Sequence, residues 1–132
     1  MFWKPFKWGF LWSLFILIIC FLPGNKLPES NFLSEIHFDK IIHAFIYMLL
    51  FILVINGAKK VLKKPFIITV IYCVVYGIII ELIQHFFILD RDGQVNDVYA
   101  NLVGVLVGII IAINKKNNNR IEPMNNLSLL LM

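Results

Sequence analysis

Apolar residues fall into four blocks along the chain, which short polar segments separate: Trp8–Leu22, Ile41–Ile55, Pro65–Leu89 and Val98–Ile113. Crossing the hydrocarbon core of a bilayer takes about 20 helical residues. Pro65–Leu89 is long enough by itself, and the other blocks reach that length once their polar flanks lie in the interface. The pattern therefore predicts an all-α integral membrane bundle of four transmembrane helices.

Composition supports the membrane class. The chain is 60% hydrophobic and only 15% charged, which leaves too few polar side chains to cover a soluble surface. The first block has the basic start of a signal peptide, but Cys20-Phe-Leu-Pro-Gly offers no small-residue cleavage pattern, so an uncleaved helix is expected. Cys20 and Cys73 both fall within predicted spans, where a thiol behaves as a small apolar group, and no disulfide is predicted.

The basic residues are distributed unevenly between the two sides of the predicted bundle. Nine of the 12 lysines and arginines fall on the side that holds both termini and the Gly57–Lys64 segment, which reads as a tight turn. An excess of lysine and arginine marks cytoplasmic loops. We therefore expect both termini in the cytoplasm (N-in/C-in), and the net charge of +4 does not indicate a nucleic-acid partner.

The chain divides at residue 114. Residues 1–114 are expected to form the membrane domain, and 115–132 a disordered cytoplasmic tail because they are rich in asparagine. Aromatic residues near the N-terminus, Trp12 among them, are expected to anchor the first helix at the interface.

Three of the predicted helices carry stripes of polar or small residues. Side chains three or four positions apart share a helix face. Two or three such faces turned toward one another would enclose a polar pocket in the half of the bundle away from the termini. The stripes are Asp39, His43 and Tyr47; Gly77, Glu81 and Gln84; and Asp97, Asn101, Gly104 and Gly108.

Glu81 is the clearest functional candidate, because a carboxylate at membrane depth costs about 2.5–3.5 kcal/mol and such residues usually face a partner or a wet cavity. Lys40 and Arg91 are placed to hold an anionic head group at the rim of the pocket. The predicted ligand-binding residues are Asp39, Lys40, His43, Tyr47, Glu81, Gln84, Arg91, Asp97 and Asn101.

Other roles stay open for the same residues. Glu81 or Asp97 could serve as a general base with His43 as acid or metal ligand, so these three are the catalytic candidates. Equally, Glu81 could pair with Lys40 or Arg91, Asp97 could cap a helix, and His43 could bond across helices. His43 with Glu81, His85 and Asp97 could bind a metal, since imidazole and carboxylate suit several divalent ions. Within this set only Glu81 and His85 are spaced as a pair, four residues apart, so neither a metal nor a cofactor is predicted.

Gly77, Gly104 and Gly108 are assigned to helix packing. Gly104-Val-Leu-Val-Gly108 is a small-xxx-small pattern, which lets another helix approach closely. The helix that approaches could belong to this chain or to a partner protein, which would make the protein a structural subunit.

The spaced polar residues resemble the VanZ-like family. The resemblance covers about Asp39 to Gly108 and rests on Asp39-Lys40-x-x-His43-x-x-x-Tyr47, Glu81-Leu-x-Gln84-x-Phe86, Arg91 and Asp97-Val-x-x-Asn101-x-x-Gly104-x-x-x-Gly108. It implies a small multi-helix protein of the bacterial cytoplasmic (inner) membrane, in a family named for a protein linked to resistance to the glycopeptide teicoplanin. The extra acidic residues in the loop 90–96 depart from the pattern and affect what the rim attracts.

Together these features predict a cell-envelope protein that binds an anionic membrane lipid or a lipid-linked cell-wall precursor in an outer-leaflet pocket. The alternatives are a membrane-embedded enzyme acting on a phospholipid or polyprenyl phosphate, and a structural subunit that docks a partner through Gly104 and Gly108.

Overall fold

The computed structural model describes residues 3–21, 38–87 and 95–131, and within these ranges every regular element is a helix. A short 3₁₀ turn, η1 (Lys4–Phe6), leads into α1 (Lys7–Phe21). Four segments of the described helices are long and apolar enough to cross a bilayer. The predicted all-α fold is confirmed for the described residues, and so is the presence of four helices long and apolar enough to span a membrane, whereas the orientation in the membrane stays a prediction. The longer helices are α3 (Phe38–Val61), α4 (Pro65–Phe87) and α5 (Val95–Leu130).

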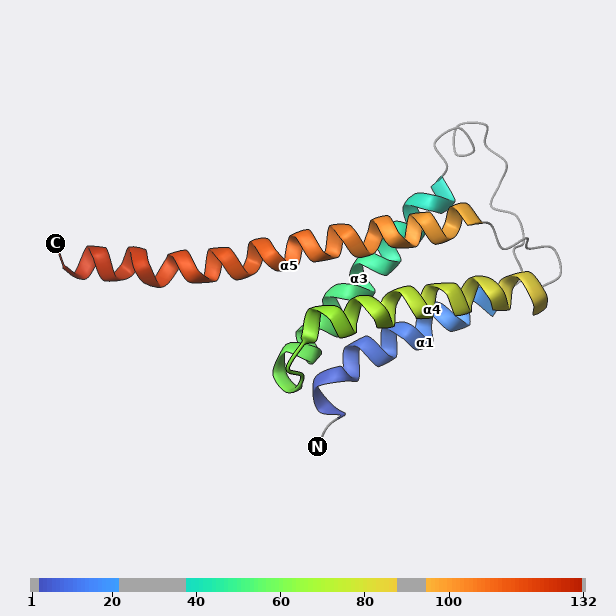
Figure 1. Ribbon diagram of the computed structural model, residues 1–132, viewed down its shortest axis with the longest axis horizontal. Coiled ribbons are helices and arrows are strands. Elements are labelled where there is room, and N and C mark those ends of the chain that lie inside the picture. The colour runs from blue at the N-terminus through green and yellow to red at the C-terminus, as the bar shows by residue number, and fades with distance from the viewer. Residues whose placement is uncertain (1–2, 22–37, 88–94, 132) are drawn as a thin grey trace.

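Helix α3 is the centre of the bundle, because its packing against α1, α4 and α5 is more extensive than the packing among those three helices (Figure 1). Its contact with α5 is the most extensive of the three. Glycines on α5 make this closeness feasible: a Cβ on Gly104 would collide with the backbone carbonyl of Ala44, and one on Gly108 would lie 2.9 Å from the Phe51 ring. Helix α5 therefore seats on α3 through the glycine face that the sequence assigned to helix packing.

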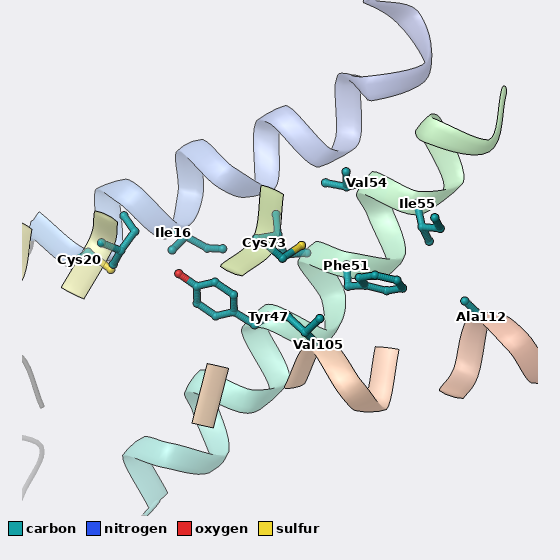
Figure 2. Close-up of a cluster of buried hydrophobic side chains, with 11 residues drawn as sticks. Ile16, Cys20, Tyr47, Phe51, Val54, Ile55, Cys73, Val105 and Ala112 are labelled. Atoms are coloured by element: carbon teal, nitrogen blue, oxygen red, sulfur yellow. The ribbon is translucent and has the colours of Figure 1, made fainter. Parts of the chain in front are cut away.

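The core lies where the other helices meet α3, and Figure 2 shows its side chains converging from all four. Tyr47, Phe51 and Ile55 are each no more than 1% exposed. The outward positions are apolar as well, with Phe86 71% and Leu106 59% exposed. An apolar exterior around an apolar core is the arrangement of a protein whose surroundings are lipid.

Helix α1 is attached to the bundle by hydrogen bonds at mid-helix. The indole N–H of Trp12 donates to the Ile46 carbonyl at 3.0 Å, so Trp12 lies between α1 and α3 and is not the interfacial anchor that the sequence predicted. The Ser13 hydroxyl is 2.8 Å from the Tyr72 hydroxyl, and the Tyr76 hydroxyl donates to the Ser13 carbonyl. In lipid, where water is absent, such bonds supply part of the helix association.

The turn between α3 and α4 is shorter than predicted. Helix α3 continues through Gly57 to Val61, and the turn consists of residues 62–64. A Cβ on Gly57 would collide with the Pro5 carbonyl and lie 3.1 Å from the Phe6 ring. Gly57 is therefore a packing position that admits η1, and the turn prediction over Gly57–Lys64 was wrong because glycine marks both situations equally.

Helix α5 continues through residues for which the composition predicts disorder. It contains 36 residues and, at 1.5 Å per residue, is about 54 Å long, against a hydrocarbon core of about 30 Å. Its C-terminal part carries Lys115, Lys116 and Arg120 and extends away from the other helices (Figure 1). A division of the chain at residue 114 stays a prediction.

Candidate functional site

One face of α4 carries the buried polar residues of the site. Gly77, Glu81 and Gln84 are all buried, and they lie three or four residues apart, so they share the side that faces the bundle. Glu81 is only 6% exposed and Gln84 only 4%. The sequence spacing thus places a carboxyl and an amide inside the bundle, although most of the surrounding helix surface is apolar.

Helices α3 and α5 bring the complementary groups to this face. The Lys40 ammonium nitrogen lies 3.2 Å from Asp97 Oδ1, which joins the first turns of α3 and α5. One turn deeper, His43 Nδ1 lies 3.1 Å from Asn101 Oδ1 and 3.9 Å from Glu81 Oε1. Asn101, His43 and Glu81 therefore form a chain of contacts across three helices with His43 at its centre, beside the Lys40–Asp97 pair.

Helix geometry explains why the acidic groups gather at this end. Asp39 and Asp97 each lie in the first turn of their helix, where the free amides and the helix dipole favour a negative charge. Lys40 also contacts Asp39, at 3.4 Å, so one ammonium bridges the starts of both helices. The Asp39 side chain is 55% exposed and that of Asp97 only 14% exposed, so Asp97 belongs to the interior of the site and Asp39 to its rim.

Two buried polar atoms of the site have no hydrogen-bond partner among the described residues. They are the Tyr47 hydroxyl and the Asn101 amide nitrogen. Both side chains lie against Gly77, since a Cβ there would be 3.2 Å from the Tyr47 ring and 3.4 Å from the Asn101 nitrogen. A buried donor without a partner costs about 1–3 kcal/mol, so the interior of the site has hydrogen-bonding capacity beyond what the protein itself uses.

A groove runs along the outside of the α3–α5 pair next to Lys40. It encloses about 550 Å³. Asn96 and Tyr99 lie along this groove, and the sequence analysis predicted neither as a site residue. Asn96 is four positions before Ala100 and Tyr99 is four positions before Val103, so each pair shares a face of α5, and this spacing could have indicated them. The lining consists of Lys40, Ile41, Ala44, Asn96, Tyr99, Ala100 and Val103.

Some predicted site residues lie apart from this cluster. Gly104 and Gly108 are covered by α3, so a partner helix at that face would have to displace α3. His85, which the sequence weighed as a metal ligand, is exposed at the end of α4. Arg91 lies outside the described residues, as do residues 90–94 of the predicted loop 90–96.

The cluster has the donor set of a metal site. His43, Glu81 and Asp97 each offer one ligand atom, and these atoms all lie within 4.8 Å of one another. Imidazole and carboxylate donors together suit several divalent ions. Because the three come from three different helices, no local spacing in the sequence displays them as a set.

A family model described as VanZ/LLP1 matches residues 3–116, which is most of the 132-residue chain. This match confirms the resemblance drawn from the spaced motif and extends it to α1, which the motif did not include. No curated protein and no solved structure matches the chain.

Proposed function

Because the chain belongs to the VanZ/LLP1 family and has four membrane-spanning helices, we propose that it binds the anionic head group of a membrane lipid or of a lipid-linked cell-wall precursor in the bacterial cytoplasmic membrane. Such binding would give it a part in cell-envelope traffic or protection, including glycopeptide (teicoplanin) resistance. The shared chemistry of these ligands is a phosphate group attached to an apolar chain.

The observation that carries the proposal is the position of Lys40 beside an apolar groove. Its side chain is 25% exposed, so the ammonium group is accessible although it contacts Asp39 and Asp97. The groove below it is lined mainly by apolar side chains and is open to the surroundings. A phosphate at Lys40 with an acyl or polyprenyl chain along Ile41, Ala44 and Val103 would satisfy both parts of the surface.

The charge distribution supports a position in the outer leaflet. Lys59, Lys60, Lys115 and Lys116 lie at the end of the bundle opposite Lys40. With that end in the cytoplasm, the positive-inside rule directs the Lys40 end toward the outer leaflet.

Native mass spectrometry of the gently purified protein tests the proposal. We expect one defined anionic lipid on the wild type and roughly tenfold lower occupancy in Lys40→Gln, equivalent to about 1.4 kcal/mol. Lys63→Gln, in the turn at the other end, is the matched control and should keep the lipid. For the groove, Val103→Trp should reduce occupancy, whereas Leu106→Trp on the lipid-facing side of α5 should not. Equal amounts of bulk lipid on all variants would contradict the proposal.

A second candidate function is a membrane-embedded enzyme acting on a phospholipid or polyprenyl phosphate. It is favoured by the closeness of His43 Nδ1 and Glu81 Oε1, 3.9 Å apart, since a positioned acid and base are what general acid–base catalysis requires. Glu81→Gln discriminates the two functions. An enzyme would retain bound lipid and lose turnover, whereas a binding protein would have no turnover to lose.

A further inference from the structure

We propose that His43, Glu81 and Asp97 bind a divalent transition-metal ion of the Zn²⁺ class. The sequence analysis considered His43, Glu81, His85 and Asp97 as ligands and predicted no metal, and the structure leaves His85 exposed. It brings the other three together, with one ligand from each of α3, α4 and α5 and all ligand atoms within 4.8 Å of one another.

The distances are close to those of a bound ion. Zinc binds imidazole nitrogen and carboxylate oxygen at about 2.0–2.2 Å in tetrahedral geometry, so two ligand atoms on one ion lie roughly 3.3–3.6 Å apart. The ligand atoms lie up to 4.8 Å apart, so the side chains would have to turn inward by about 1 Å to hold one ion. Side-chain rotation is the expected route, because α3 and α5 are seated on each other through Gly104.

Asn101 provides an independent indication. It is 4% exposed, and its Oδ1 lies 3.1 Å from His43 Nδ1. In the tautomer in which Nδ1–H donates to that oxygen, Nε2 keeps its lone pair for a metal, and the ring has to turn to present it, because the nitrogen 3.9 Å from Glu81 Oε1 is Nδ1. Histidine ligands of metals commonly donate their other ring N–H to an oxygen in this way, which fixes the ring. The Asn101 amide nitrogen, without a partner among the described residues, remains able to donate to a further ligand of the ion.

The charges at the site suit a cation. Asp39, Glu81 and Asp97 bring three carboxyl groups, whereas Lys40 brings one ammonium group that contacts Asp39 and Asp97. An ion held by Asp97 would compete with Lys40 for that carboxylate. Lys40 would then keep its contact with Asp39 and turn its other N–H groups toward the groove, where the proposed phosphate lies.

A phosphate group bound to the metal would connect the metal site to the proposed lipid. Three protein ligands leave at least one coordination position open on an ion of this class, and a phosphate oxygen is a suitable occupant. The metal and Lys40 would hold the same head group from two sides. The connection to a phosphate rests on the proposed function, whereas metal binding itself is measured without lipid.

The test uses the full chain in detergent, stripped with EDTA and then equilibrated with Zn²⁺ for metal analysis. We expect about one Zn²⁺ per chain, and affinity at least about 100-fold lower in His43→Gln and Glu81→Gln. His85→Gln, which changes an exposed histidine, is the matched control and should bind as the wild type does. Circular dichroism of each variant shows whether the helices persist.

A second experiment measures a new absorption band instead of a loss of metal binding. His43→Cys with Co²⁺ should show a thiolate-to-cobalt charge-transfer band that the wild type with Co²⁺ lacks. Absence of stoichiometric Zn²⁺ on the wild type, or equal Zn²⁺ on the wild type, His43→Gln and Glu81→Gln, would overturn the metal proposal. If zinc binding fails this test but a defined lipid stays on the EDTA-treated protein, the metal proposal falls and the proposed function stands. If Zn²⁺ binds but no defined lipid does, the proposed function falls and the metal proposal stands.

Discussion

Two tyrosines with the same hydroxyl illustrate what a polar atom does inside this bundle. The Tyr76 hydroxyl donates to the Ser13 carbonyl and connects α4 to α1. The Tyr47 hydroxyl is buried and has no hydrogen-bond partner among the described residues, although its ring is part of the core (Figure 2). One hydroxyl therefore contributes to stability, and the other costs stability unless a ligand uses it.

Replacing each tyrosine by phenylalanine should separate these roles. Tyr76→Phe removes a donor and leaves the Ser13 carbonyl with one bond fewer, so we expect a loss of about 1 kcal/mol in the free energy of unfolding. Tyr47→Phe keeps the ring and removes an unsatisfied group, so stability should stay equal or rise. Unfolding in mixed micelles, followed by circular dichroism, measures both; a larger loss in Tyr47→Phe than in Tyr76→Phe would refute this account of the two hydroxyls.

Residue spacing predicted the members of the site but not their pairing. The spacing of Glu81, Gln84, Asp97 and Asn101 correctly places them on inward faces, because a helix fixes which side chains share a side. Whether Glu81 meets His43 or a cation depends on how α3 sits on α4, and no local pattern carries that information. The sequence analysis considered His43, Glu81 and Asp97 together with His85 as metal ligands, and only the packing of the three helices shows which of the four side chains come together.

At the scale of elements, small residues determine how closely the helices approach. A Cβ on Gly104 would collide with backbone atoms of Ala44, which can move only if α3 itself moves. At Gly77 the nearest atoms are side-chain atoms of Tyr47 and Asn101, at 3.2 and 3.4 Å, and a small shift of a side chain relieves that contact. The two glycines thus differ in what a methyl group would displace.

We predict opposite tolerance to alanine at these positions. Gly104→Ala should lose about 1–3 kcal/mol through overpacking, even after the better helix propensity of alanine. Gly77→Ala should be nearly neutral, because a propensity gain of about 1 kcal/mol offsets the shift of the Tyr47 ring. Denaturant titration of both variants in the same micelles gives the comparison, and equal stability of Gly104→Ala and the wild type would mean that α5 does not seat on α3 as described.

The elements themselves were largely predictable, whereas their ends were not. Apolar blocks locate all four spans, since length and hydrophobicity suffice for a membrane helix. Gly57 was misjudged because a glycine at a turn and a glycine beneath a packed segment look alike until η1 is placed. The polar residues after Ile113 indicate disorder by composition, yet α5 continues to Leu130 as one uninterrupted helix.

The molecule as a whole has two chemically different ends. At one end Lys40 lies among Asp39, Glu81 and Asp97. At the other, a pocket of about 640 Å³ between α3, α4 and α5 is lined by several basic side chains, which suits the anionic phospholipids of an inner leaflet. The pocket is lined by Asn56, Lys59, Pro65, Phe66, Lys115, Lys116, Asn119 and Arg120.

This polarity leads to a prediction about orientation. In a background with Cys20→Ala and Cys73→Ala, a cysteine introduced as Asp39→Cys should react with a membrane-impermeant maleimide in intact cells. Lys115→Cys should react only after permeabilisation. The reason is the positive-inside rule, which assigns the basic end to the cytoplasm. Removing the native thiols should not disturb the labelling result, because both are buried inside the bundle.

The orientation also decides which lipids the Lys40 groove meets. If Lys115→Cys reacts in intact cells and Asp39→Cys does not, the groove faces the cytoplasm, and a lipid-linked precursor would have to be bound before it crosses the membrane. If both positions react in intact cells, the maleimide has entered the cells, and intact and permeabilised samples give the same labelling. A cytoplasmic protein with a reactive cysteine is the control for such leakage. Labelling at Asp39→Cys alone would leave the outer leaflet as the source of the ligand, because Lys40, one residue away, and the groove beside it lie at the same end of the bundle.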